Sequence, residues 1–155
     1  TKSLKIVKLN IFNKNHLIKV FKSKMKYDFI FNFTTCKISQ SSKVFDNEYF
    51  EKLNNFYLEP MKLFFKNYKN HDKNTRFFIP STIYINNKEK KKLFKEYVEA
   101  KLNAEKLAKR LNNKKKMFYS FRLDEYDTDQ HYSFVQKRIN NDIKYFVNKL
   151  KKFLS

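Results

Sequence analysis

The stretch EKKKLFKEYVEAKLNAEKLAKRLNNKKKMFYSFR, residues 89–122, holds the most regular pattern in the chain and determines the fold expected for its second half. From about Glu89 to Asn112, apolar residues return every three or four positions, which predicts one amphipathic helix. Asn86 or Asn87 can cap its first turn. We expect the apolar stripe of this helix to pack against protein. The stripe consists of Leu93, Tyr97, Ala100, Ala104, Leu107 and Leu111.

Shorter patterns predict the other elements. Residues 27–34, YDFIFNFT, alternate between aromatic and other side chains, which predicts a strand with one apolar face. Pro60 is expected to break the helix that Asp46 can cap, and Pro80 places its strand at a sheet edge. We expect strands at 4–9, 17–21, 27–34 and 77–85, and helices at 46–58, 60–68, 89–112 and 132–153. The last helix carries one apolar stripe, made of Tyr132, Val135, Ile139, Ile143, Phe146, Leu150 and Phe153.

Together these elements predict a single α+β domain over residues 1–155. Residues 1–85 are expected to supply a small sheet of about four strands and one helical region. Residues 86–155 are expected to form a helical half built from two long helices. No repeat and no linker divides the chain into two domains.

The charge of the chain is its strongest functional signal. Lys and Arg number 35 against 15 Asp and Glu, which gives a formal net charge of +20. Self-repulsion of this size destabilises a compact state unless counter-charges bind, and nucleic acid is the commonest polyanion, followed by an anionic membrane face. The chain has no Gly and no Trp but many residues with A/T-rich codons, which indicates an AT-rich genome such as that of an organelle. Part of the lysine excess therefore reflects coding bias.

Several kinds of chemistry lack the residues that they need. Without Gly, a P-loop, a dinucleotide-binding fingerprint and a nucleophile elbow cannot take their standard forms. The single Cys36 excludes a disulfide framework and a cysteine-based zinc site. The three histidines are isolated, and no apolar run reaches the roughly 20 residues that span a bilayer. The acidic loop 124–129 alternates like a calcium loop, but the Gly is missing and Val135 stands where a closing Glu is needed. We therefore expect no enzyme activity, metal or cofactor.

Two groups of basic residues flank the long predicted helix. Lysines at its start face the positive end of the helix dipole, whereas those after its end lie where cations are favoured. Beyond Asn113, basic and aromatic residues alternate as on RNA-binding surfaces; the alternative is that the aromatic residues fold back onto the core. We expect Lys114–Lys116 and Arg122 to contact phosphates, with Phe118 or Tyr119 as the anchor. The predicted RNA-binding residues are Lys88, Lys90, Lys91, Lys92, Lys109, Arg110, Lys114, Lys115, Lys116, Phe118, Tyr119 and Arg122.

The segment from Glu99 to Leu111 also resembles a helix of the third small-subunit ribosomal protein family, a KH-domain family. That helix has the form D-A-K-L-V-A-E-x-I-A-x-Q-L-E-x-R and is followed by a basic-aromatic segment. The matching residues are Glu99, Ala100, Lys101, Leu102, Ala104, Glu105, Ala108, Leu111, Phe121 and Arg122. The resemblance implies a KH-like domain in a diverged or split mitochondrial ribosomal protein. The G-x-x-G loop and the second domain of the family are absent, so their RNA contacts do not carry over.

These observations favour a structural constituent of an organellar ribosome in the mitochondrial matrix. Its expected partners are rRNA and neighbouring ribosomal proteins, without a membrane or a small-molecule substrate. The alternative from another class is a soluble basic accessory subunit of a mitochondrial membrane complex. An RNA-processing enzyme is a third possibility, but no catalytic constellation supports it.

Overall fold

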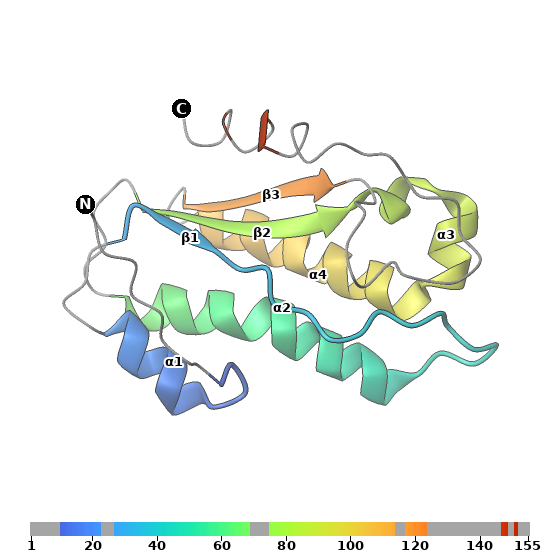
Figure 1. Ribbon diagram of the computed structural model, residues 1–155, viewed down its shortest axis with the longest axis horizontal. Helices are drawn as coiled ribbons and strands as arrows, with labels where there is room; N and C mark the ends of the chain where they lie inside the picture. The colour runs from blue at the N-terminus through green and yellow to red at the C-terminus, as the bar shows by residue number, and fades with distance from the viewer. Residues whose placement is uncertain are drawn as a thin grey trace.

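Strands and helices alternate along the chain (Figure 1). The computed structural model describes residues 10–22, 27–68, 75–113, 117–123, 147–148 and 151. In chain order the elements are α1 (Lys14–Phe21), β1 (Phe29–Phe31), α2 (Asn47–Asn67), β2 (Arg76–Thr82), the 3-10 helix η1 (Ile83–Asn86), α3 (Lys88–Leu93), α4 (Lys95–Asn112) and β3 (Phe118–Leu123). The expected strand at 4–9 and most of the expected helix at 132–153 lie outside the described residues.

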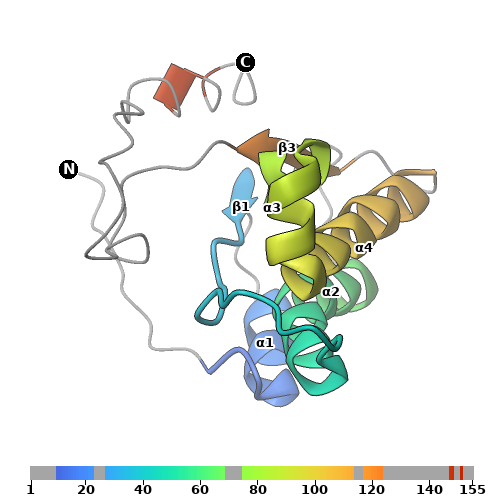
Figure 2. The ribbon, with the colours of Figure 1, turned by 90° about the vertical axis from the view of Figure 1, so that its right-hand side faces the viewer.

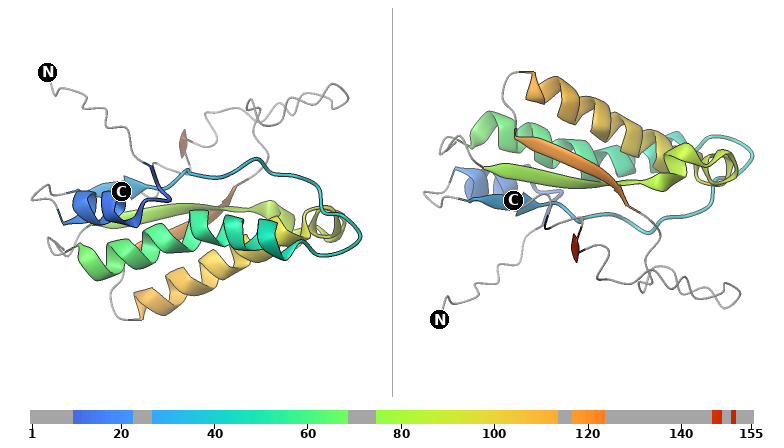
Figure 3. Two further views of the ribbon diagram at one scale, coloured as in Figure 1. Left: turned by 90° about the horizontal axis from the view of Figure 1, so that it is seen from below. Right: turned by 90° about the horizontal axis from the view of Figure 1, so that it is seen from above.

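The three strands form one parallel sheet in the order β1-β2-β3. Each strand is added next to the strand that precedes it in the chain, so the sheet grows in one direction. Crossovers between parallel strands are almost always right-handed. Both connecting helices should therefore lie on one face, and Figures 2 and 3 show α2 and α4 together on one face. The predicted mixture of helices and strands is confirmed. The sheet has three strands in the described ranges, however, rather than the four expected.

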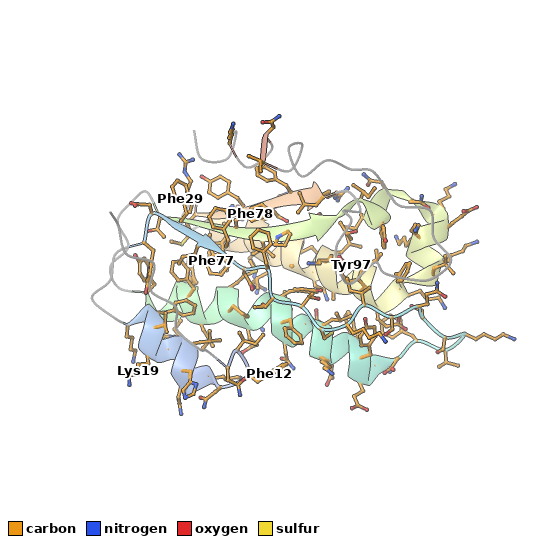
Figure 4. All side chains as sticks on the ribbon, in the orientation of Figure 1. Phe12, Lys19, Phe29, Phe77, Phe78 and Tyr97 are labelled. Carbon is orange, nitrogen blue, oxygen red and sulfur yellow. The ribbon has the colours of Figure 1, made fainter. Side chains whose placement is uncertain are left out.

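The core fills the space between this face of the sheet and the two long helices (Figure 4). Phe77 and Phe118 are partners across β2 and β3, and both are buried against the helices. The ring of Phe64, from α2, lies 5.1 Å from that of Phe77 and 5.2 Å from that of Phe21 in α1. Large aromatic side chains therefore supply much of the buried apolar area, in a chain whose smallest core residues are alanines of α4.

The segment predicted as a strand at 17–21 belongs to helix α1, so that prediction was wrong. Asn13 caps the helix, since its side chain accepts hydrogen bonds from the amides of Asn15 and His16. Leu17 and Phe21, four residues apart, are its buried residues. The helical spacing and the cap outweigh the β-branched composition of this segment.

Helix α2 continues through Pro60, where a break was expected. Proline has no N–H, so it leaves the carbonyl oxygen of Phe56, four residues earlier, without its helical partner. The buried side chain of Asn32 donates to that oxygen at 3.3 Å. An amide group from the end of β1 thus replaces the missing helical bond, and the helix stays intact.

The long helix predicted from Glu89 to Asn112 is instead two helices that meet at Phe94. Ser41 accounts for the break, because its amide donates to the Leu93 carbonyl at 2.7 Å and its hydroxyl accepts from the Lys95 amide at 2.7 Å. Two of the backbone groups that the break frees, the Leu93 carbonyl and the Lys95 amide, are thereby satisfied. Of the predicted stripe, the four residues from Tyr97 to Leu107 are buried and Leu111 is half-buried, but Leu93, before the break, is 45% exposed.

Pro80 lies in the central strand β2, although it was expected at an edge. The pairing of β1 ends at Phe31, opposite Phe78, and the Phe78 carbonyl accepts from the Asn32 amide. Two residues further along β2, the backbone of Pro80 faces the same side, where β1 has no more paired residues. The missing N–H costs no ladder bond there, and the Pro80 carbonyl accepts from Lys101 at 2.7 Å.

Candidate nucleic-acid interface

The first group of predicted RNA-binding residues lies on α3. Asn87 caps this helix by accepting from the amides of Glu89 and Lys90. Lys88, Lys91 and Lys92 are exposed. Lys90 is half-buried, with its ammonium nitrogen 5.1 Å from the ring centroid of Tyr84, a cation–π distance. The four lysines that are neighbours in sequence lie together on α3, and the Asn87 cap fixes the start of this short helix.

The second group surrounds the carboxyl end of α4. Lys109 and Arg110 are exposed on its last turn. Lys114, Lys115 and Lys116, predicted to contact phosphates, lie outside the described residues. Hydrogen bonds hold the residues that flank them in place. The side-chain oxygen of Asn112 accepts from the Met117 amide at 3.1 Å and from the Phe118 amide at 2.8 Å. The Asn112 side-chain nitrogen donates to the Phe118 carbonyl at 2.6 Å. One asparagine thus joins the end of α4 to the start of β3.

A concavity of about 750 Å³ lies between the end of α4 and β3. Polar and basic residues from α4 form one wall, and β3 forms the other. Its lining residues are Glu105, Ala108, Lys109, Asn112, Asn113, Phe118, Tyr119, Ser120, Phe121 and Arg122. Four of the twelve predicted residues therefore meet in one hollow, whereas the lysines of α3 adjoin the other end of α4.

Arg122 is held by acidic and amide oxygens rather than pointing freely outward. Its guanidinium donates to both carboxylate oxygens of Glu105, each at 2.9 Å, and to Asn86 at 2.7 Å. Ser81 also donates to Glu105 at 2.6 Å. The hydrogen bond from Arg122 holds the pKa of the Glu105 carboxyl below its usual value, against the opposing effect of burial. Glu105 therefore pairs with a residue of β3, which fixes Arg122 on the α4 side of the sheet.

Phe118 is buried, and its ring lies 5.5 Å from that of Phe77 and 6.2 Å from that of Phe64. Its ring fills the core, which corresponds to the alternative that the aromatic residues fold back, and a ring buried in this way is not exposed to RNA. Tyr119, the other residue expected to anchor the segment, is half-buried and lies on the opposite face of the sheet, beside Phe78. Successive side chains of a strand point to opposite faces, so Phe118 and Tyr119 lie on different sides of the sheet. Without the strand register, the sequence could not show which of the two faces the core.

Sequence reasoning missed Lys101, a buried lysine that lies 4% exposed between the sheet and α2. Its ammonium nitrogen lies 3.7 Å from the ring centroid of Tyr57 and 5.5 Å from that of Tyr97. Burial lowers the pKa of Lys101 to about 7 and raises the pKa of Tyr97 to about 12. Lys101 directly follows Ala100, a residue of the predicted apolar stripe. This position beside the stripe was the sequence feature that could have indicated its burial. The Lys101 ammonium group also donates to the Pro80 carbonyl at 2.7 Å, so this residue joins α4 to β2.

Sequence reasoning also missed which side of the sheet the aromatic residues of 27–34 occupy. The register places Phe29 opposite Arg76 and Phe31 opposite Phe78, on the face away from α2 and α4. Ile30, opposite Phe77, packs against the core instead. The alternation was recognised in the sequence, but only the position of the helices shows which set of side chains faces them.

Within the described ranges, no group of three or more His, Cys, Asp or Glu residues is placed to hold a metal ion. None of the helices in those ranges combines the length and the apolar character needed to cross a membrane. No protein-family model, curated protein or solved structure matches the chain. Functional inference therefore starts from the surface of the chain itself.

Proposed function

We propose that this chain is a structural RNA-binding protein of an organellar ribosome, located in the mitochondrial matrix. It neutralises rRNA phosphates with lysines and contacts neighbouring ribosomal proteins, without catalysis. The observation that carries the proposal is the surplus of exposed basic side chains on α3 and on the end of α4. Lysine suits this task, because it meets phosphates as a point charge and reads no base edges.

The ion pairs of the described residues leave this surplus unneutralised. Glu59 pairs with Lys14 and Lys62, Glu99 lies 3.9 Å from Lys106, and Glu105 takes Arg122. On α3 and the end of α4, Lys88, Lys91, Lys92, Lys109 and Arg110 are exposed and have no ion pair within the described ranges. The same holds for exposed lysines elsewhere in those ranges, which are Lys19, Lys22, Lys37, Lys43, Lys52, Lys66 and Lys151. A polyanion is the partner that would offset their mutual repulsion.

The finer assignment, to the small subunit, depends on the resemblance of residues 99–111 to the third small-subunit ribosomal protein family. In this structure the matching helix is α4, and the residues that follow it lead into β3. Glu105 and Lys109 of the matching segment line the concavity described above. A KH-like origin of this domain is part of the same proposal.

The proposal is tested by comparing two triple variants with equal changes in charge. The first is Lys88→Glu, Lys91→Glu and Lys92→Glu on α3, and the control is Lys19→Glu, Lys37→Glu and Lys43→Glu at other exposed positions. Binding of a single-stranded RNA of mixed sequence is measured over a range of salt concentrations. If three phosphate contacts are lost, the log–log slope of the α3 variant should be smaller by about 2 than that of the unaltered chain.

The control should keep a slope close to that of the unaltered chain, and the unaltered chain should sediment with ribosomal particles in a lysate that contains magnesium. Equal slopes for the two triple variants would remove α3 as the interface. Binding to anionic lipid vesicles, together with failure to sediment with ribosomes, would favour an accessory subunit of a membrane complex instead.

A further inference from the structure

The face of the sheet away from α2 and α4 is lined with aromatic rings, and we call it the aromatic face. Phe31 and Phe33 stack with ring centroids 6.0 Å apart, and both rings approach that of Phe78, at 5.8 and 5.9 Å. The ring of Phe121 lies 5.5 Å from Phe78 on its other side. The aromatic face consists of Phe29, Phe31, Phe33, Phe78, Tyr119 and Phe121, and each of these residues has further interactions beyond these ring contacts.

A parallel sheet is normally covered on both of its faces, because its strands are apolar on both sides. Helices α2 and α4 cover one face here. On the aromatic face Phe78 is 0% exposed, although it belongs to no part of the core under the helices. Phe31 and Phe33, at 37% and 50%, remain partly exposed. A second layer packed on Phe31 and Phe33 would therefore bury apolar area that is still exposed on this face.

The chain after β3 contains a segment suited to form that layer. In residues 132–153 seven apolar side chains follow a three-and-four spacing, which corresponds to a helix with one apolar stripe. Val147, Asn148 and Lys151, the residues of this segment that the structure describes, have helical backbone and are exposed. All three lie off the apolar stripe. The red segment at 147–148 lies on the side of the sheet opposite α2 and α4 in Figures 1 and 3.

We propose that residues 132–153 form an amphipathic helix whose apolar stripe packs on the aromatic face. The occupant of that face is thus a segment of this chain. The eight residues 124–131 can span roughly 26–29 Å when extended, enough to return from the end of β3 across a three-stranded sheet. A helix of 22 residues is about 33 Å long, which exceeds the length of β2 at about 23 Å.

The charges of the segment agree with this orientation. Residues 132–153 hold six basic residues and one acidic residue, Asp142. At helical spacing, Lys137, Lys144, Lys151 and Lys152 lie on the side opposite the apolar stripe, and Arg138 and Lys149 lie at its flanks. Packing the stripe on the aromatic face would therefore leave four cations toward solvent and two at the border of the contact, and it would place no charge between the rings.

Cross-linking between the face and the stripe tests the proposal. In a Cys36→Ser background, Phe31→Cys is combined with Ile139→Cys, Ile143→Cys or Phe146→Cys on the stripe. The matched controls combine Phe31→Cys with Asn141→Cys or Asn148→Cys, which lie on the opposite side of the same helix. Purified chains without RNA are treated with a short bis-maleimide. At least one stripe position should give the intramolecular product ten times faster than either control.

Equal rates for stripe and control positions would overturn the proposal, and so would products formed only between two chains. A second comparison does not depend on cysteine variants that fold. Ile143→Asp with Phe146→Asp should lower the melting temperature clearly below that of Asn141→Asp with Asn148→Asp, and equal melting temperatures would also overturn it. Because both experiments use protein without RNA, their outcome is independent of the proposed ribosomal function.

Discussion

Lys101 is an example of a charged residue whose position is set by a single backbone oxygen. Its ammonium group reaches the Pro80 carbonyl at the point where β1 no longer pairs with β2. The face of the Tyr57 ring stabilises the charged form, while burial disfavours it and lowers the pKa to about 7. The structure describes no carboxylate paired with this lysine. The hydrogen bond therefore gives the Pro80 carbonyl a partner, but it requires a charged group to be buried.

The first prediction concerns the pH dependence of stability. The pKa of Lys101 falls from 10.5 to about 7 on folding, so between these values the unfolded chain binds more protons than the folded chain. The free energy of unfolding should therefore rise with pH from about 7 toward 9.5, and below pH 7 the penalty for the buried charge is present in full. Lys101→Met should remove this rise and increase stability at pH 6 by a few kcal/mol, on the order set by about 1.4 kcal/mol per pKa unit.

Urea unfolding at a series of pH values measures this effect. Lys109→Met, an exposed substitution on the same helix, serves as the control and should keep the rise. The comparison is limited to pH values below about 9.5, because tyrosines exposed on unfolding begin to ionise near pH 10. Identical pH profiles for the unaltered chain and Lys101→Met would show that Lys101 titrates normally in the folded protein.

At the level of elements, side chains from distant segments complete backbone bonds that helices and strands leave open. Asn32 replaces the bond that Pro60 removes from α2, and Ser41 pairs with two backbone groups at the break between α3 and α4. The Ser41 hydroxyl also donates to the carboxylate of Glu96, which accepts from the Asp46 amide at 2.9 Å. Burial raises the pKa of Glu96, but these hydrogen bonds outweigh it, so the net pKa lies below the usual value.

The second prediction follows from the several roles of Ser41. Ser41→Ala removes an acceptor from the Lys95 amide and a donor from the buried Glu96 carboxylate. Leaving these groups without partners should lower the free energy of unfolding by about 1–3 kcal/mol. Ser39→Ala, at an exposed position of the same loop, should change it by less than about 0.5 kcal/mol. Equal effects of the two substitutions in urea unfolding would contradict this account of the break.

The third prediction concerns the junction between α4 and β3. Asn112→Ala removes three hydrogen bonds to the backbone of Met117 and Phe118, and should cost about 1–3 kcal/mol of stability. Asn113→Ala, at the neighbouring exposed position, should have little effect. Hydrogen exchange of the β3 amides adds a local measurement, since exchange should accelerate in Asn112→Ala but not in Asn113→Ala. Unchanged exchange in both variants would mean that β3 is held by the sheet alone.

The sequence predicted those elements whose pattern is local and failed where a distant group decides the outcome. Asp46 was recognised as a cap, and Asn87 as one of two candidates with Asn86, because a cap and its helix are adjacent. Nothing in the sequence near Pro60 or Phe94 shows that Asn32 or Ser41 will pack there. The sequence therefore predicted two helices where α2 is continuous, and one helix where α3 and α4 are separate. The segment 17–21 is a different kind of failure, since its spacing and the preceding Asn13 already indicated a helix.

The candidate interface was predicted in part for the same reason. The grouping of the α3 lysines follows from their adjacency in sequence, and the hollow between α4 and β3 gathers Lys109, Tyr119 and Arg122. The local pattern does not show the partner of Glu105, because Lys109 is the cation one helical turn away on the same helix. Its partner is Arg122, since the parallel pairing of β3 with β2 brings position 122 onto the α4 side.

For the whole molecule, a formal net charge of +20 on 155 residues is the dominant long-range term. The fourth prediction is that the melting temperature rises as sodium chloride increases from about 50 to 500 mM, because salt screens the repulsion among the cations. The triple variant Lys88→Glu, Lys91→Glu and Lys92→Glu lowers the net charge by six, and its melting temperature should rise less over the same range. A melting temperature that falls with salt in the unaltered chain would show that attractive ion pairs outweigh the repulsion.

The order of the strands in the sheet is also their order in the chain, and this has a consequence for synthesis. As the chain leaves a ribosome, β2 can join β1 and then β3 can join β2, so each new strand finds its neighbour already made. Domains with such sequential pairing can assemble progressively from the amino-terminal side. The aromatic face is completed when β3 docks, ahead of residues 132–153. During that interval the aromatic face of the nascent chain would be exposed to solvent, and this is the stage at which a chaperone would bind it.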